Sequence, residues 1–132
     1  CWTKTPGICR MKDDGEEYQR SLSKADMLLY ISPISAGFIT TETKKALDRF
    51  ITNALPYITI YNKECHHLQR YPEKKPTLGI ALLDDGNIDE RSINLIFNNF
   101  DRIRKNMRSK RKFNFLLNES NIEELYSEII NN

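Results

Sequence analysis

The chain has 132 residues, a length that suits one folded domain with a single hydrophobic core. Its 20 basic and 18 acidic residues give a net charge of +2, so overall charge singles out neither a nucleic acid, nor an anionic membrane, nor an acidic partner. No apolar run approaches the roughly 20 residues that cross a bilayer, and residues 1–17 lack the apolar centre of a signal peptide. Three cysteines without a secretion signal favour reduced thiols, so we predict a cytoplasmic protein with no membrane partner.

The first half of the chain alternates predicted helix, strand and helix. Residues 13–26 place apolar residues on one stripe with charges elsewhere, which is typical of a surface helix. The continuous apolar run at residues 27–33 predicts a buried parallel strand that stops at Pro33. Residues 40–55 carry apolar residues at helical spacing and end before Pro56, so they predict the crossover helix of a βα unit.

The second half repeats this alternation after an insertion. The insertion, "YITIYNKECHHLQRYP" at residues 57–72, is predicted to be a loop or an arm that contacts another subunit. Residues 76–86 predict a second buried strand, residues 89–107 an amphipathic helix, residues 112–118 a third strand and residues 119–132 a terminal helix. Strands that alternate with helices predict an α/β fold with a parallel sheet and right-handed crossovers.

The strand predicted at residues 27–33 would expose an apolar edge in a sheet of only three strands. A further strand would pair along that edge. We therefore expect residues 1–132 to be a single domain from which an upstream strand is missing, and a chain that begins at Cys1 rather than Met agrees with that expectation.

Two stretches of the sequence carry a family resemblance. The first is "CWTKTPGICRMKDD" at residues 1–14, with a Gly-x-Cys and an Asp-Asp before a helix. The second is "SPISAGFITTETKKALDRF" at residues 32–50, in which Ser-Pro and an aliphatic residue lead through a glycine turn to a helix ending in Asp48 and Arg49. In this order, and without a gap, they resemble the flavodoxin-like NAD(P)H-dependent flavin mononucleotide (FMN) reductases and their iron-sulfur flavoprotein relatives.

The resemblance implies a flavodoxin-like three-layer α/β/α fold. Its parallel sheet would have the family's strand order 2-1-3-4-5, with the first strand and its phosphate-binding loop absent from this chain. FMN would lie at the carboxyl end of the strand at residues 27–33, where α/β sheets bind their ligands. The implied contacts with the flavin come from Ser32, Pro33, Ile34, Ser35, Ala36, Gly37 and Phe38.

The backbone of residues 33–38 would then donate amides to the polar edge of the flavin ring, and Gly37 would allow a close approach. No catalytic side chain is implied, because the cofactor performs the chemistry. Without the resemblance, the same stretch is also compatible with an ordinary turn in which Thr40 or Thr41 caps the following helix.

The implied function is an FMN-binding oxidoreductase that passes electrons from NAD(P)H through the flavin to a small-molecule acceptor. The resemblance also implies a homodimer or higher oligomer. The alternative is a flavodoxin-like electron carrier or binding domain without reductase turnover. Seven residues separate Cys1 from Cys9, so the visible cysteines do not support an iron-sulfur cluster or a metal half-site, and we predict free thiols.

The run of Cys65, His66 and His67 invites a metal hypothesis. Adjacent side chains of an extended segment point to opposite faces, so we predict no metal site there. Asp84 and Asp85 follow the second strand and precede Gly86, and we predict that they form a turn.

The strongest charge signal is a basic cluster near the end of the helix predicted at residues 89–107. Its members are Arg102, Arg104, Lys105, Arg108, Lys110, Arg111 and Lys112. Such cations complement the carbonyl dipole of a solvated helix end, which is the preferred interpretation. Nucleic-acid contact is the second interpretation, but the cluster has no interleaved aromatic residues, so we do not expect a nucleic-acid partner.

Overall fold

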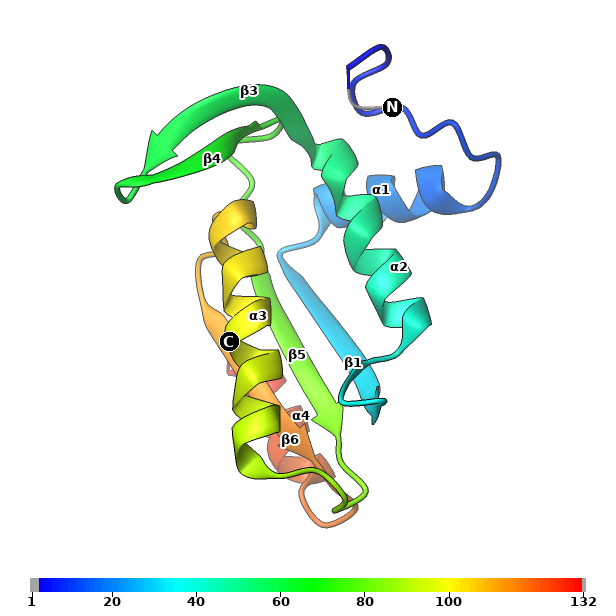
Figure 1. Cartoon of the computed structure of the whole chain (residues 1–132), viewed down its shortest axis with the longest axis vertical. Helices are drawn as coiled ribbons and strands as arrows, with labels where there is room; N and C mark the ends of the chain where they lie inside the picture. The colour runs from blue at the N-terminus through cyan, green and yellow to red at the C-terminus, as the bar shows by residue number, and fades with distance from the viewer. Residues whose placement is uncertain (1–2, 132) are drawn as a thin grey trace.

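Three parallel strands form the centre of the molecule in the computed structural model, which describes residues 3–131. They are β1 (Met27–Ser35), β5 (Thr77–Leu83) and β6 (Lys112–Leu117), and they lie side by side with their carboxyl ends at the same edge (Figure 1). A short strand, β2 (Phe38–Ile39), pairs antiparallel with the end of β1, so the sheet order is β2-β1-β5-β6. The predicted α/β class with a parallel sheet is confirmed.

The four predicted helices are confirmed within the described residues. They are α1 (Gly15–Lys24), α2 (Thr41–Arg49), α3 (Glu90–Met107) and α4 (Ile122–Ile130). Helix α2 is shorter than expected, because a 3-10 turn, η1 (Phe50–Asn53), replaces its predicted last turn. None of the helices in this part of the chain is long and apolar enough to cross a bilayer.

The two faces of β5 carry different core clusters, because successive side chains of a strand point to opposite faces. On one face, Ile80 packs in the larger cluster with side chains of α2 and α3. On the other face, Ala81 packs with Phe113 of β6 and Leu125 of α4. Burial on both faces explains why β5 reads as a continuous apolar run.

Strand β1 does not stop at Pro33 as predicted but continues to Ser35. Proline lacks a backbone N–H and is tolerated where a strand has a neighbour on one side only. Pro33 is such a position, because it pairs with Leu83 of β5 on one side, whereas β2 begins to pair only at Ile34.

The insertion at residues 57–72 is not a loop. It contains most of a β-hairpin, β3 (Ala54–Tyr61) and β4 (Glu64–Gln69), which projects beyond the amino-terminal end of the central sheet (Figure 1). Asn62 and Lys63 connect the strands with φ angles of 49° and 63°, the left-handed geometry of a two-residue hairpin turn. The described residues therefore form two separate sheets.

Candidate functional site

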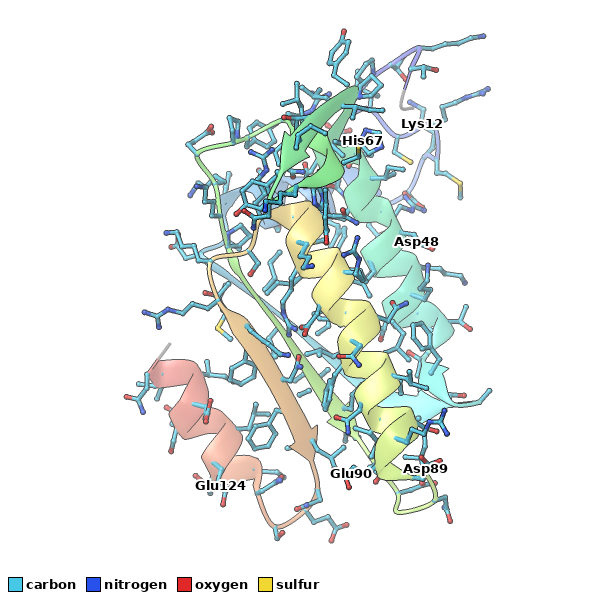
Figure 2. The ribbon with its side chains drawn as sticks, turned by 60° about the vertical axis from the view of Figure 1, so that its left-hand side comes forward. Lys12, Asp48, His67, Asp89, Glu90 and Glu124 are labelled. Carbon is cyan, nitrogen blue, oxygen red and sulfur yellow. The ribbon has the colours of Figure 1, made fainter. Side chains whose placement is uncertain are left out.

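The carboxyl edge of the parallel sheet holds the predicted flavin-binding residues. Helix α3 begins at this edge after its N-cap Asp89, whereas His67 lies on the hairpin at the opposite end of the molecule (Figure 2). Ligands of open α/β sheets bind outside the carboxyl ends of the strands, so this edge is the first candidate site.

Three of the seven predicted flavin-binding residues also hold the local fold together. Ser32 is fully buried, and its hydroxyl donates to the carbonyl oxygen of Pro33 at 2.9 Å and accepts from the Thr40 N–H at 3.0 Å. Ile34 and Phe38 pack against the larger core cluster. Ser32 thus ties the end of β1 to the start of α2, which fixes the turn between them.

The other four residues, Pro33, Ser35, Ala36 and Gly37, are exposed. Ser35 and Phe38 pair across the β1–β2 hairpin, so Ala36 and Gly37 are its two turn residues. Their φ angles are 50° and 75°, and a Cβ on Gly37 would meet nothing within 4 Å. The segment is therefore a tight turn that presents open backbone to solvent.

Thr40 caps the N-terminus of helix α2, which was one of the two caps predicted, because its hydroxyl accepts from the Thr43 N–H at 3.4 Å. Helix α3 is capped in the same way by Asp89, whose carboxylate accepts from the Ser92 N–H at 2.9 Å. The Ser92 N–H and hydroxyl hold the pKa of Asp89 below its usual value. The N-termini of α2 and α3 are thus capped by side chains of the chain itself, whereas α4, which follows β6 at the same edge, has no side-chain cap and carries Glu123 and Glu124 in its first turn.

Asp84 and Asp85 form the turn predicted for them. Asp84 accepts from the Gly86 N–H at 3.0 Å, and Asp85 accepts from the Asn87 N–H at 3.1 Å. Hydrogen bonds from Asn87 lower the pKa of Asp85, so its carboxylate is charged at neutral pH. These two residues shape the loop after β5 and leave an acidic rim beside the β1 turn.

The two stretches that carry the family resemblance meet in space. Arg49, at the end of α2, pairs with Asp13 through hydrogen bonds of 2.9 and 2.5 Å and approaches the Cys9 sulfur at 3.6 Å. The Arg49 hydrogen bond is the main cause that lowers the pKa of Asp13. Cys9 and Cys65 carry free thiols as predicted, and Cys1 lies outside the described residues.

A second candidate site is a cavity of about 370 Å³ beneath the β3–β4 hairpin, between the ends of α2 and α3. Its walls are mostly apolar, and its polar groups include His66 and His67. His66 is buried and its Nδ1 lies 2.9 Å from Oδ1 of Asn106. No group of three or more metal-ligating side chains occurs among residues 3–131. Helix α3 rises about 1.5 Å per residue, so Ile103 of this cavity lies roughly 20 Å from Glu90, where α3 begins at the carboxyl edge. The two candidate sites are therefore separate.

The hairpin is fastened to α3 by charged side chains. Glu64 of β4 lies 2.9 Å from Nη1 of Arg102 and 3.1 Å from Nζ of Lys105. The hydrogen bond from Lys105, followed by that from Arg102, lowers the pKa of Glu64. Two of the predicted solvated cations are therefore bound to the hairpin.

The interpretation of the basic cluster as a solvated helix end is wrong for Arg104, which is only 6% exposed. Its guanidinium donates to the carbonyl oxygens of Leu78 and Phe113 and to the side chains of Asn114 and Asp101. Burial lowers the pKa of Arg104, and Asp101 opposes that effect. Arg104 therefore links the end of α3 to the starts of β5 and β6.

Comparison of the sequence with protein-family models and with curated proteins gives no match. The flavin reductase resemblance therefore rests on the two motifs and stays a prediction. The sequence did not indicate the cavity beneath the hairpin, because residues 57–72 were predicted to be a loop or an arm that contacts another subunit. The only visible signal was the alternation of apolar and polar residues from Tyr57 to Tyr61.

Proposed function

We propose that the chain is a cytoplasmic FMN-binding oxidoreductase domain of flavodoxin-like three-layer order, which passes electrons from NAD(P)H to a small-molecule acceptor. The flavin ring would lie against the turn from Ser35 to Phe38 at the carboxyl edge. The observation that carries this proposal is the open backbone of Ala36 and Gly37, with free space at Gly37, where a parallel sheet offers its ligand site.

The residues present fit the ring of a flavin. Exposed amides of the turn suit the polar edge of an isoalloxazine, and a glycine lets the backbone come close. The flavin, when bound, supplies the capacity to accept a hydride and to pass electrons on. Ser32 keeps the turn in place through its bonds to Pro33 and Thr40. The protein would thus bind and orient the ring without an acid or base of its own.

The fit is weaker for the phosphate of FMN. A helix N-terminus with free N–H groups is a ready-made phosphate site, but Thr40 and Asp89 already cap α2 and α3. The N-terminus of α4 has no side-chain cap, but Glu123 and Glu124 in its first turn would repel a phosphate. The described residues at this edge therefore offer contacts to the ring more readily than an anchor for the phosphate.

The hairpin is the proposed contact with a second copy of the chain. Ile58 and Ile60 are 69% and 68% exposed on it, and Tyr57 beside them is also exposed. Exposed apolar side chains on a projecting element favour association with another protein surface.

The first test is the visible absorption spectrum of the purified protein, mixed with FMN and then with NADH or NADPH without oxygen. We expect a bound flavin whose absorption bleaches when the dinucleotide is added. A bound flavin that stays oxidised would support the electron carrier instead. A protein that leaves the spectrum and fluorescence of added FMN unchanged would refute flavin binding.

A matched pair of variants tests the contact itself. Gly37→Asn keeps a residue that tolerates positive φ but fills the open space with a side chain, so it should weaken FMN binding at least about tenfold. Thr41→Asn adds the same side chain on the first turn of α2 and should leave the affinity within about twofold. Equal affinities for the two variants, with unchanged melting temperatures, would contradict the assigned contact.

A further inference from the structure

Positive charge is concentrated in one short segment of the chain. Residues 101–112 hold seven of the 20 basic residues and one of the 18 acidic residues, so this segment carries +6 while the remainder carries −4. The carbonyl end of a helix contributes only about half a negative charge, which is too little to balance such an excess. The segment therefore keeps an excess of positive charge that the helix dipole does not balance, and this excess would attract an anionic ligand.

The segment borders a hollow of about 290 Å³ at the carboxyl end of α3. Tyr61 and Asn62, at the tip of the hairpin, form one wall of the hollow. The rest of its lining comes from the end of α3 and the connection to β6, namely Asp101, Arg104, Lys105, Arg108, Ser109, Lys110, Arg111 and Lys112.

The nearby carboxylates account for only part of this charge. Asp101 pairs with Arg104 and Lys112, and Glu64 pairs with Lys105 and Arg102. Within residues 3–131, neither Arg108 nor Lys110 has a carboxylate partner. The hollow is thus left with cations that its own acids do not neutralise.

Arg108 is held in position for a ligand. Its backbone adopts the left-handed conformation that ends α3, and its guanidinium lies over the Tyr61 ring at 4.8 Å from the ring centre. Its Nε is buried and has no hydrogen-bond partner among the described residues. Stacking on an aromatic ring fixes a guanidinium while leaving its in-plane donors available for phosphate oxygens.

We propose that this hollow binds a soluble oligophosphate, with Arg108 and Lys110 as the principal contacts. Arginine donors match phosphate oxygens in pairs, and lysine adds a point charge. A small ligand is favoured over a nucleic acid because the hollow is concave and, of the described residues that line it, only Tyr61 is aromatic. Strand-binding grooves instead use a series of aromatic residues on which successive bases stack.

The proposed site does not depend on flavin binding. It lies at the amino-terminal end of the sheet, where Lys112 begins β6, and the flavin turn lies at the carboxyl edge. A protein that does not bind flavin could still bind the oligophosphate, and the reverse also holds. Each proposal can therefore be refuted without the other.

Isothermal titration calorimetry with inorganic tripolyphosphate tests the proposal. We expect saturable binding of one ligand per chain, which weakens at higher ionic strength because the contacts are exposed charges. Lys110→Gln should lower the affinity about fivefold or more, and so should Arg108→Gln. Lys45→Gln removes the same charge from an exposed position on α2 and should change the affinity less than about twofold.

Lys110→Gln is the decisive variant, because Lys110 lies in a connection and its loss should leave the melting temperature unchanged. Equal losses of affinity in Lys110→Gln and Lys45→Gln would show that tripolyphosphate is attracted by the overall charge, and would overturn the site. Absence of saturable binding would also overturn it. A short single-stranded RNA that binds through the same residues, and that tripolyphosphate does not displace, would replace the small ligand with a nucleic acid.

Discussion

Replacement of Arg104 by methionine tests whether this buried cation holds the end of α3 on the sheet. The guanidinium donates to the carbonyl oxygen of Leu78 at 2.6 Å, to that of Phe113 and to Oδ1 of Asn114 at 2.5 Å. Methionine fills a similar volume but donates no hydrogen bond. A buried acceptor without a partner costs about 1–3 kcal/mol, and two carbonyl oxygens would lose their side-chain donor.

We therefore expect Arg104→Met to lower the free energy of unfolding by about 3 kcal/mol, with part of the loss offset by the burial of the methionine side chain. The measurement is urea denaturation followed by circular dichroism. Arg102→Met is the control, because Arg102 forms an exposed pair with Glu64 and should cost less than about 1 kcal/mol. If the two variants unfolded at the same urea concentration, the structural role assigned to Arg104 would be wrong.

Three further variants test separate contacts. Glu64→Gln removes a carboxylate whose pKa is lowered in the folded protein. The carboxylate of Glu64 therefore stabilises the fold at neutral pH, and this effect is lost as the pH falls through the folded pKa. The variant should melt at a lower temperature than the wild type at neutral pH, and the difference should disappear in acid. Ile60→Glu should convert a dimer to a monomer in light scattering, whereas Ile122→Glu, also at an exposed site, should not. Gly15→Ala would place a methyl group 2.3 Å from the Arg49 guanidinium, which would have to move away from the Cys9 sulfur. Cys9 should then be more accessible and react faster with thiol reagents, as mass spectrometry of the labelled site would show.

The central elements were predictable from the sequence because their burial follows local spacing. Helix α3 is an example, since Ile93, Ile96 and Phe100 recur at helical intervals and are all buried against the sheet. The continuous apolar run of β5 likewise follows from cover on both faces. Each of these patterns can be read without knowing what the element packs against.

The hairpin was missed because its turn lacks the usual signal. Two-residue turns with positive φ favour Asn-Gly, whereas this chain has Asn62 followed by Lys63 at φ 63°. Lysine seldom adopts that conformation, so the sequence favoured a loop. The contacts of Glu64 with α3 help to hold the hairpin in place, and they join residues about 40 positions apart in the chain.

Arg104 shows a second limit of local patterns. It stands among six other cations, and its charge favoured the prediction that it is solvated. The helical interval from Phe100 to Met107 places Arg104 on the buried stripe of α3, but that interval alone does not provide partners for a buried charge. What buries it is the position of the carbonyl oxygens at the starts of two strands, which depends on the assembled sheet. The turn at Gly37 was predicted only in part. Its glycine indicated a turn, but the sequence did not indicate that β1 continues past Pro33.

The charge of the carboxyl edge bears on which flavin the chain would prefer. Asp84, Asp85, Asp89 and Glu90 follow the end of β5. They would repel the phosphate of a bound FMN, whereas riboflavin has no such charge. The capped N-termini of α2 and α3 and the acidic first turn of α4 offer that phosphate little compensation. If the ring contacts dominate, FMN should bind no more tightly than riboflavin, and added salt should shift the ratio of affinities toward FMN by screening the repulsion. Much tighter binding of FMN at low salt would instead require a phosphate anchor elsewhere in the protein.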